Sequence, residues 1–220
     1  MMWFICEDVT FAYGSTPIVD SVSLCLEQGQ IAAVLGPSGS GKSTLLRLIA
    51  GLEKPDHGTI AVDGMILSSE HIQMEVHRRP VGLVFQDYHL FPHMTLRQNI
   101  AFGAHHLPLS QRKAWVNHLL DLTELTEHAE KYPHQASGGM QQRTAIARAL
   151  AHQPKVLLLD EPFSNLDASL TQRLRSQMKA WFKQERVTVI LVTHDPQDAE
   201  ALADFTLNLS AKTPFKLTEN

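Results

Sequence analysis

The stretch Gly36-Pro-Ser-Gly-Ser-Gly-Lys-Ser-Thr44 decides the fold, and it directly follows the apolar run Ile31-Ala-Ala-Val-Leu35. Its first eight residues fit the pattern G-x-x-x-x-G-K-[ST]. Glycines let consecutive backbone N–H groups curl around an anion, and a helix that begins here adds its positive N-terminal end. Lys42 can then reach the terminal phosphates of a nucleotide, and the Ser43 hydroxyl can bind Mg²⁺. The stretch therefore predicts a nucleoside-triphosphate site.

The alternative for this stretch is a glycine- and serine-rich turn that happens to hold a lysine. The apolar run before it and the helical pattern after it argue against that alternative, because the phosphate-binding pattern requires a strand and then a helix. The candidate phosphate-binding residues are Gly36, Pro37, Ser38, Gly39, Ser40, Gly41, Lys42, Ser43 and Thr44.

The overall composition excludes several classes of protein. The chain has 220 residues, of which 44% are hydrophobic and 19% charged, as is ordinary for a soluble globular protein. Its formal net charge of −4 is not the basic footprint of a nucleic-acid-binding protein. No apolar run approaches the ~20 residues that a membrane helix needs. We therefore expect a cytosolic protein without nucleic acid that can still dock on a membrane protein.

The pattern along the chain predicts an α/β core. Short apolar runs at 31–35, 81–85, 156–159 and 187–192 suit parallel strands covered on both faces. Alternating residues from Trp3 to Glu27, and a hairpin around Asp63-Gly64, predict an antiparallel sheet that would bury Cys6 and Cys25 as thiols. Helices are expected at 42–51, 139–151 and 170–185. The segment of roughly 92–154 has no convincing strand and predicts a helical insertion, with further helices at 96–102 and 111–122.

A second chemical element is Val156-Leu-Leu-Leu-Asp160-Glu161. The carboxylate of Asp160, at the end of a buried strand, suits Mg²⁺, and that of Glu161 could deprotonate a water. A strand that merely ends in an acidic turn is the alternative, which the phosphate-binding stretch makes unlikely.

A third element is Ala136-Ser-Gly-Gly-Met-Gln-Gln-Arg143, where a serine and two glycines open a helix. Such a helix start can bind an anion without a lysine of its own. A head-to-tail pair, in which Ser137 to Gly139 of one copy close over the nucleotide of the other, would explain two anion sites in one chain. A plain serine N-cap is the alternative.

At these motifs the chain resembles the nucleotide-binding subunits of ATP-binding cassette (ABC) transporters over nearly its whole length. Gly36 to Ser43 resembles the Walker A loop, and Gln86 the Q-loop glutamine. Ser137, Gly138 and Gly139 resemble the signature motif, and Asp160-Glu161 resembles Walker B with its catalytic glutamate. Ser164-Asn-Leu-Asp167 resembles the D-loop, His194 the switch histidine, and Tyr13 the aromatic residue that stacks on adenine.

The resemblance implies a fold and a set of roles. The fold is α/β, that of the P-loop NTPases: a RecA-like parallel sheet core with an antiparallel β subdomain and an inserted helical subdomain, in one ABC ATPase domain over residues 1–220. Its ligands would be ATP and Mg²⁺, with Ser43, Gln86 and Asp160 at the metal. Glu161 would be the general base, and His194 would contact the γ-phosphate. Asp167 would cross the two-fold axis to the partner's phosphate loop.

Two departures from the family pattern stand out. Ala136 and Met140 occupy positions that are usually leucine and glutamine in the signature motif, so we expect slower closure, which the double change Ala136→Leu with Met140→Gln should reverse. The sequence also stops at Asn220, where similar subunits continue into a C-terminal regulatory β domain, so we expect no regulation through such a domain.

The stretches Phe85 to Thr95 and Gln98 to Gly103 resemble importers of the ferric-iron, polyamine, sulfate and sugar group. Within that group, Gly51 to Pro55 and Phe85 to Tyr88 most resemble the iron(III) importers. The expected partners are a second ATPase subunit, most simply an identical copy, an integral membrane permease and a substrate-binding protein. The chain would lie peripherally on the cytoplasmic face of the membrane. The rivals are a soluble ABC ATPase of DNA repair or translation, and a nucleotide-binding regulator that no longer hydrolyses.

Overall fold

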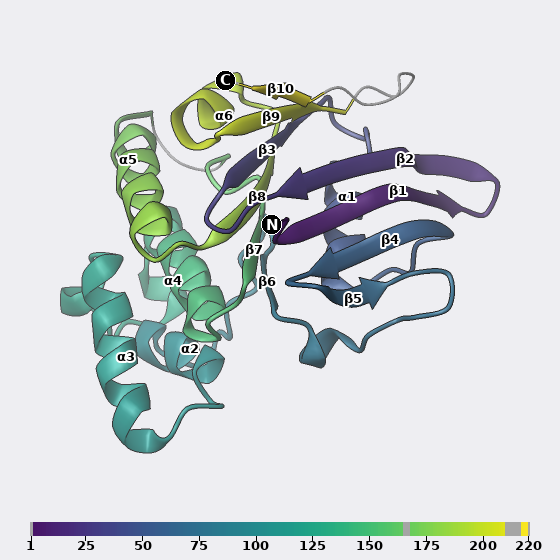
Figure 1. The fold of residues 1–220 in the computed structure, drawn as a ribbon. Coiled ribbons are helices and arrows are strands. Elements are labelled where there is room, and N and C mark those ends of the chain that lie inside the picture. Colours follow the sequence, from purple (N-terminus) through teal and green to yellow (C-terminus); the bar gives the residue numbers. More distant parts are fainter. Residues whose placement is uncertain (1, 165–167, 210–216, 220) are drawn as a thin grey trace.

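Two β-sheets organise the chain (Figure 1). The structure is a computed structural model that describes residues 2–164, 168–209 and 217–219. A six-stranded sheet has the order β10-β9-β3-β8-β7-β6, and a four-stranded antiparallel sheet has the order β2-β1-β4-β5. The strands are β1 Phe4–Tyr13, β2 Thr16–Leu26, β3 Ile31–Leu35, β4 His57–Val62, β5 Met65–Ser68, β6 Val81–Val84, β7 Val156–Asp160, β8 Thr188–Thr193, β9 Phe205–Asn208 and β10 Leu217–Glu219.

Six α-helices surround these sheets in the described residues. They are α1 Lys42–Ala50, α2 Leu96–Gly103, α3 Leu109–Leu122, α4 Gly138–Ala151, α5 Ala168–Gln184 and α6 Pro196–Leu202. Short 3₁₀ turns lie at Val76–Arg78, Thr126–His128 and Pro133–Gln135. None of the helices in this part of the chain combines the length and the apolar character that spanning a bilayer requires.

The strands β3, β7 and β8 are buried on both faces, which is why their sequences are apolar without interruption. Alternate side chains divide between two hydrophobic clusters. Ala32, Val34 and Leu158 pack on the side of α1 and the antiparallel sheet, whereas Ile31 and Leu157 pack on the side of α2 to α6. Each fully buried aliphatic side chain of this kind contributes about 1.5–3 kcal/mol. The predicted α/β class, a parallel sheet with an antiparallel sheet beside it, is confirmed.

The antiparallel sheet follows the predicted hairpins, with one correction. Asp63 and Gly64 both have positive φ, 50° and 74°, as a type I′ turn requires. Cys6 is fully buried, and burial raises the pKa of its thiol. Cys25 was expected to be buried as well, but it is exposed. It lies opposite Ile5, on the outward face of the edge strand β2, because side chains alternate between the faces of a sheet.

Helices α2, α3 and α4 lie between β6 and β7 in the chain, in the region where a helical insertion was predicted. Thr95 begins α2 with a capping box, in which its hydroxyl accepts from the Gln98 N–H. Gly51 ends α1 in the left-handed conformation, φ 84°, as the sequence predicted. The division of the chain into one domain with an inserted subdomain remains a prediction.

The sequence analysis did not assign α6, β9 or β10. Helix α6 carries a recognisable start signal, because Asp195 caps it by accepting from the Gln197 N–H and Pro196 stands at its first position. Strand β9 pairs in parallel with β3 and extends the six-stranded sheet beyond the phosphate-binding strand. The β9 pattern of four residues is too short for periodicity to identify.

Candidate active site

The loop between β3 and α1 is shaped by glycines. Gly39 and Gly41 have φ of 80° and 92°, which other residues rarely adopt. A Cβ at Gly36 would lie 2.5 Å from the Leu209 carbonyl oxygen, and one at Gly41 would lie 2.5 Å from that of Ile18. The loop therefore fits between β2 and the segment after β9 only with glycine at these positions.

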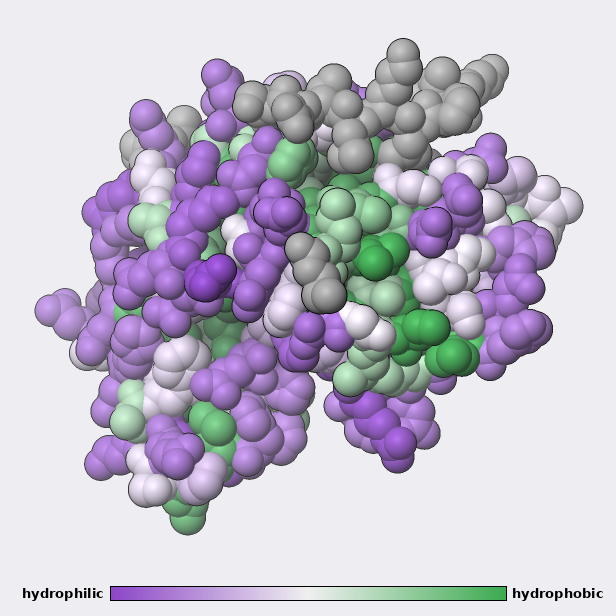
Figure 2. Space-filling model, in the orientation of Figure 1, coloured by the Kyte–Doolittle hydropathy of each residue, from purple (hydrophilic) through white to green (hydrophobic). Residues whose placement is uncertain are grey.

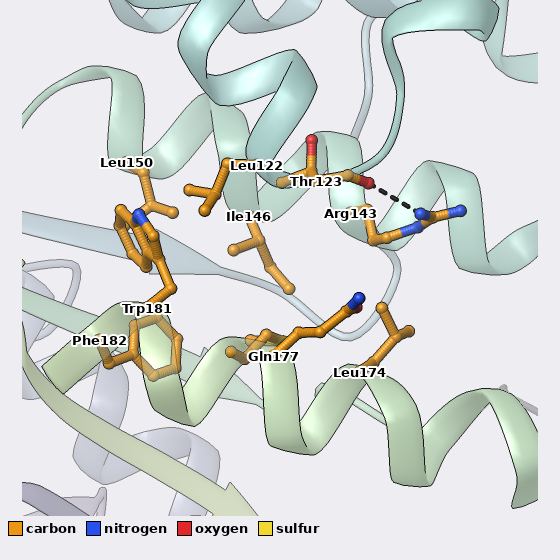
Figure 3. Close-up of a pocket in the computed structure, with 10 residues that line it drawn as sticks. Leu122, Thr123, Arg143, Ile146, Leu150, Leu174, Gln177, Trp181 and Phe182 are labelled. Atoms are coloured by element: carbon orange, nitrogen blue, oxygen red, sulfur yellow. Dashed lines mark hydrogen bonds between the residues drawn. The ribbon is translucent and has the colours of Figure 1, made fainter. Parts of the chain in front are cut away.

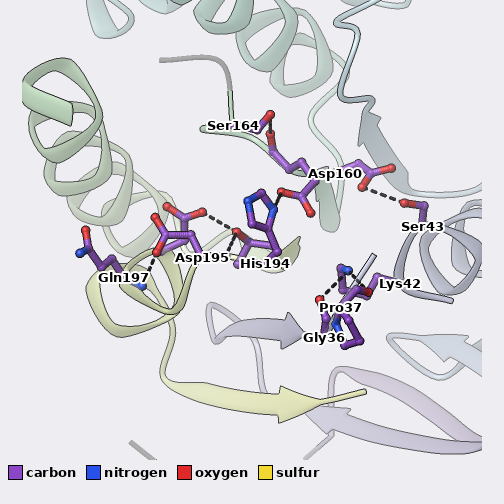
Figure 4. A network of polar contacts seen from close by, with 12 residues as sticks. Gly36, Pro37, Lys42, Ser43, Asp160, Ser164, His194, Asp195 and Gln197 are labelled. Carbon is purple, nitrogen blue, oxygen red and sulfur yellow. Dashed lines mark hydrogen bonds and ion pairs between the residues drawn. The ribbon is translucent and has the colours of Figure 1, made fainter. Parts of the chain in front are cut away.

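Lys42 is the first residue of α1, and its side chain turns back over this loop (Figure 4). Its Nζ donates to the carbonyl oxygens of Gly36 and Pro37, at 2.8 and 2.9 Å. No side chain caps the N-terminus of α1, so its first N–H groups and its positive end are available to an anion. Ser40 is 7% exposed, and its buried hydroxyl has no hydrogen-bond partner among the described residues. These groups together suit a phosphate chain.

Ser43 and Asp160 meet although 117 positions separate them in the sequence. The Ser43 Oγ donates to Asp160 Oδ1 at 3.0 Å. Burial raises the pKa of the Asp160 carboxyl above its ordinary value, the Ser43 hydrogen bond opposes that rise, and the neighbouring Glu161 adds to it. A divalent cation between these two oxygens would relieve the burial cost, and hydroxyl and carboxylate oxygens are suitable Mg²⁺ ligands.

Mg²⁺ would need further ligands from elsewhere. Among the described residues, no group of three or more His, Cys, Asp or Glu side chains is arranged to hold a metal ion. The donor set fits a cation that shares its coordination with nucleotide phosphates and water, as Mg²⁺ commonly does in nucleotide sites.

Glu161 and His194 form a second close pair. His194 Nδ1 lies 2.7 Å from Glu161 Oε2. Strands β7 and β8 are parallel neighbours, with Asp160 opposite Val192, so the residues that follow them emerge together. Glu161 has φ of 49°, a costly conformation for a non-glycine residue, and its N–H donates to the Val192 carbonyl at 2.9 Å. The glutamate carboxylate is mostly shielded and the histidine ring mostly exposed, so the pair stands at the mouth of the site.

The carboxyl ends of adjacent parallel strands bring these groups to one edge of the sheet. Gln86 follows β6 at this edge and is exposed. Within the described part of the chain, no hydrogen bond joins Gln86 to Ser43 or Asp160. The structure thus gathers Lys42, Ser43, Asp160, Glu161 and His194, and leaves Gln86 at the rim.

Tyr13 lies at the end of β1, close to the loop. It pairs with Thr16 of β2. Two positions further along β2, the carbonyl oxygen of Ile18 adjoins Gly41 of the loop. Its ring is 46% exposed, and Phe11 meets it edge-on with ring centroids 4.8 Å apart. Its hydroxyl donates to Glu53 Oε1 at 2.9 Å. The sequence analysis missed Glu53, which lies 40 positions away and carries no local signal.

Ser137 caps α4, and its hydroxyl accepts from the Met140 N–H at 3.3 Å. Ser137 and Gly138 are exposed, whereas Met140 is only 8% exposed and packs in the cluster on the helical side of the sheet. Helices α1 and α4 pack against opposite faces of the six-stranded sheet. Within one chain, the Ser137–Gly139 segment therefore makes no part of the phosphate-binding loop. Asp167 lies outside the described residues.

Two hollows differ in the polarity of the residues that line them. A polar one of about 270 Å³ adjoins the pair just described and is lined by Glu161, Ser164, Arg175, His194 and Asp198 among others. The second, of about 40 Å³, lies between α3, α4 and α5 (Figure 3). It is lined mainly by apolar residues such as Leu122 and Phe182, with Arg143 donating to the Thr123 carbonyl at its end. Glu161 and His194 therefore line the polar hollow, whereas Lys42, Ser43 and Asp160 do not.

Comparison with known proteins gives consistent matches. Residues 19–164 match the family described as ABC transporter. The chain is 46% identical over 204 residues to a probable sulfate/thiosulfate import ATP-binding protein CysA of Chlorella vulgaris, covering 92% of this chain and 85% of that protein. It is 45% identical to the Fe(3+) ions import ATP-binding protein FbpC of Escherichia coli K12 and 46% identical to the putrescine transport ATP-binding protein PotG of the same strain.

The chain spans a little over half the length of those two relatives, 57% of FbpC and 52% of PotG, while they cover 91% and 90% of this chain. Among solved structures, the dimeric ATP-binding cassette MJ0796 in a post-hydrolysis state with ADP and Pi matches with a TM-score of 0.84. The two sequences are 29% identical, and the alignment covers 98% of both chains.

Proposed function

Because this chain belongs to the ABC transporter family, whose ATP-binding subunits are ATPases, we propose that it is the ATP-hydrolysing subunit of a solute importer. The observation that carries the proposal is the convergence of a phosphate-binding loop, a Ser43–Asp160 pair and a Glu161–His194 pair at one sheet edge. The relatives that match over about 90% of this chain are named as import or transport ATP-binding proteins.

The proposed chemistry follows from where each group stands. Lys42 would leave the loop carbonyls for the terminal phosphates of ATP, with the N–H groups of the loop around them. Ser43 and Asp160, with Gln86 moving in from the rim, would hold Mg²⁺, which when bound neutralises developing phosphate charge.

Glu161 is placed to deprotonate an attacking water, because its carboxylate faces the polar hollow from the end of β7. His194 shares a short contact with that carboxylate and would orient it while reaching the γ-phosphate with the rest of its ring. Positioning and fixed charge would carry most of the rate acceleration, as is usual for phosphoryl transfer.

The proposed active unit is a pair of chains around two nucleotides. Ser137 and Gly138 are exposed at the start of α4, on the helical side of the sheet, and so are available to a nucleotide bound by another copy. The similar cassette MJ0796 is described as a dimer. Tyr13 would stack on adenine, and Asp167 would cross the two-fold axis. The domain organisation that we propose is an ATPase core with a helical insertion at roughly 92–154. Each copy then carries both a phosphate-binding loop and a Ser137–Gly139 segment.

The segment after Gln86 is the proposed contact with a membrane permease. Tyr88 and His89 both have positive φ, 58° and 44°. Arg148 of α4 holds this shape, because its guanidinium donates to both of their carbonyl oxygens at 2.9 and 2.8 Å. Phe91 lies 5.3 Å from the same guanidinium and contacts Phe102, which is 49% exposed.

A permease helix that moved against this segment would displace α4 through Arg148. The displacement would reach Ser137, Gly138 and Gly139 at the start of α4. Tyr88 and Leu90 also pack partly on the helical core, and packing there is the alternative explanation for their apolar character. The proposed location is therefore peripheral, on the cytoplasmic face of a membrane through the permease, and a substrate-binding protein would complete the system.

The solute is proposed first as a class and then as an individual ion. Relatives named for sulfate, iron(III) and putrescine transport match at 46%, 45% and 46% identity, so overall similarity supports an importer of small ions without choosing among them. The lean to iron(III) rests on the stretches Gly51 to Pro55 and Phe85 to Tyr88 alone. A soluble ABC ATPase unconnected to transport is the alternative.

The enzymatic part is tested by comparing the purified chain with Glu161→Gln. Phosphate release with Mg-ATP should fall roughly 10²–10⁴-fold, because the general base is lost. ATP binding, followed with a fluorescent nucleotide, should persist. Near-normal turnover in the Glu161→Gln variant would remove Glu161 from this role, and a wild-type chain that binds ATP without hydrolysing it would favour a regulator.

A further inference from the structure

A charged network lines the same polar hollow as the Glu161–His194 pair. Arg175 of α5 is 8% exposed and Asp198 of α6 is 3% exposed. Arg175 Nε donates to Asp198 Oδ1 at 2.7 Å, and its Nη2 donates to Asp195 Oδ2 at 2.8 Å. One guanidinium therefore holds two carboxylates of the segment that follows β8.

This network fixes the backbone on both sides of His194. Thr193, which precedes it, donates its hydroxyl to Asp198 Oδ2 at 2.6 Å. The same hydroxyl accepts from the N–H of Asp195, which follows the histidine, at 3.0 Å. Figure 4 shows Asp195 and His194 side by side at the end of β8. The direction of the imidazole is thus set by groups that Arg175 orders.

Arg175 also touches the loop that carries Glu161. Its guanidinium lies 5.6 Å from the centroid of the Phe163 ring, which is 5% exposed and two positions beyond the glutamate. Cation–π contacts of this kind are strongest where water is excluded. The same side chain therefore contacts both segments that emerge from β7 and β8, each next to a proposed reactive group.

A role confined to stability explains this arrangement poorly. Buried ion pairs often contribute little net stability, because the cost of removing two charges from water offsets their attraction. The planar guanidinium fork, in contrast, fixes directions: it can bind two carboxylates and stack on a ring at once, which an ammonium group cannot do.

We propose that Arg175 is a positioning residue that sets the Glu161 carboxylate and the His194 ring, 2.7 Å apart, in their productive relation. It acts through Phe163 on one side and through Asp198, Thr193 and Asp195 on the other. The proposal rests on the proposed ATPase function, and it assigns Arg175 to the hydrolysis step and not to nucleotide binding.

The test compares Arg175→Lys with Arg173→Lys. The first keeps the positive charge and loses the fork. The second is a matched control on the same helix, because Arg173 is mostly exposed and pairs with Glu124 on the helical side. In a second pair, Thr193→Val removes the hydroxyl at nearly constant volume, and Thr193→Ser keeps the hydroxyl with the loss of one methyl group. This pair decides the matter if Arg175→Lys does not fold.

Two readouts are needed: kcat and KM for ATP, and the imidazole NMR signals of His194, assigned with a His194→Gln variant. We expect kcat to fall about 10–100-fold in Arg175→Lys and Thr193→Val, with KM changed less than about twofold and the His194 signals shifted. Arg173→Lys and Thr193→Ser should keep wild-type values in both readouts.

Folded Arg175→Lys and Thr193→Val proteins with wild-type kcat and unshifted His194 signals would overturn the proposal. So would a loss carried mainly by KM, which would assign the network to nucleotide binding. If the wild-type chain proved to have no ATPase activity, the proposed function would fail on its own, and the NMR comparison would still decide whether Arg175 orders His194.

Discussion

At the scale of single residues, the site contains a carboxylate whose charge opposes folding. Burial raises the folded-state pKa of Asp160 above its value in the unfolded chain, so the folded state holds a proton more tightly. The stability associated with that proton is fully present below the unfolded pKa of about 3.9 and is lost as pH rises through the folded pKa. At neutral pH the buried charge therefore lowers stability.

The variant Asp160→Asn should accordingly melt at a higher temperature than wild type near neutral pH, and this gain should vanish as pH falls toward about 4. The amide oxygen can still accept from Ser43. Mg-dependent hydrolysis should be lost at the same time, because a metal ligand is removed. A scan of melting temperature against pH checks this, and a destabilised variant at neutral pH would contradict it.

Sequence alone could predict which groups would carry the chemistry, because their patterns are local. Lys42 and Ser43 stand at fixed offsets in the glycine-rich stretch, and Asp160 and Glu161 end an apolar run. What it could not supply was contact between side chains far apart in the sequence, such as Tyr13 with Glu53 or Arg175 with Asp198. These pairs depend on how α1, α5 and α6 pack against the strands, and no periodicity records that packing.

At the scale of elements, the packing of α2 against α4 depends on one close contact. Gly103 ends α2 where a Cβ would lie 2.1 Å from the Arg148 carbonyl oxygen of α4. To relieve this clash, α2 would have to move away from α4, whose Arg148 also donates to the carbonyls of Tyr88 and His89. The strands and long helices were predictable from apolar patterns, but this contact was not, because a glycine at a helix end reads simply as a stop signal.

We expect Gly103→Ala to destabilise the protein by about 1–3 kcal/mol, as overpacking usually does. Urea unfolding measures the change. Ala114→Ser, at an exposed position of α3, is the control and should stay within about 0.5 kcal/mol of wild type. Equal stability of both variants would mean that α2 and α4 can separate freely at this point.

The outer face of the antiparallel sheet is a further feature at this scale. Figure 2 shows apolar side chains over this sheet, where Met65 and Ile66 of β5 are 46% and 41% exposed. The sequence placed the hairpin correctly but could not tell which of its faces would be covered. Burial does not alternate along β5: Met65 and Ile66 are exposed, and Leu67 and Ser68 are buried, beside a register shift in the pairing with β4.

At the scale of the whole molecule, the two helix starts that are proposed to bind anions belong to helices on opposite faces of the six-stranded sheet. The account therefore predicts assembly driven by nucleotide. With Mg-ATP, the Glu161→Gln variant should shift from its monomer mass of 24.6 kDa to about twice that value in light scattering, because slow hydrolysis traps the closed pair. Adding Lys42→Ala to this variant should keep it monomeric by weakening ATP binding.

Fold class and family could be predicted at this scale because the motifs occur in a fixed order along one chain. A pair of copies could be inferred from the two helix starts of one chain, whereas the membrane partner followed from the family resemblance alone, and both remain predictions. Ser137 and Gly138, proposed for the contact between copies, and Phe102, proposed for the permease contact, are all exposed.

The measurement that tests the central claim most directly is purification of the tagged chain from native membranes in mild detergent. If the chain is an importer subunit, a polytopic membrane protein should co-purify with it. The segment from Tyr88 to Phe91, which Arg148 holds, should be required for this association. A chain that hydrolyses ATP normally, yet is recovered without any membrane protein, would contradict the importer assignment and favour a soluble ATPase.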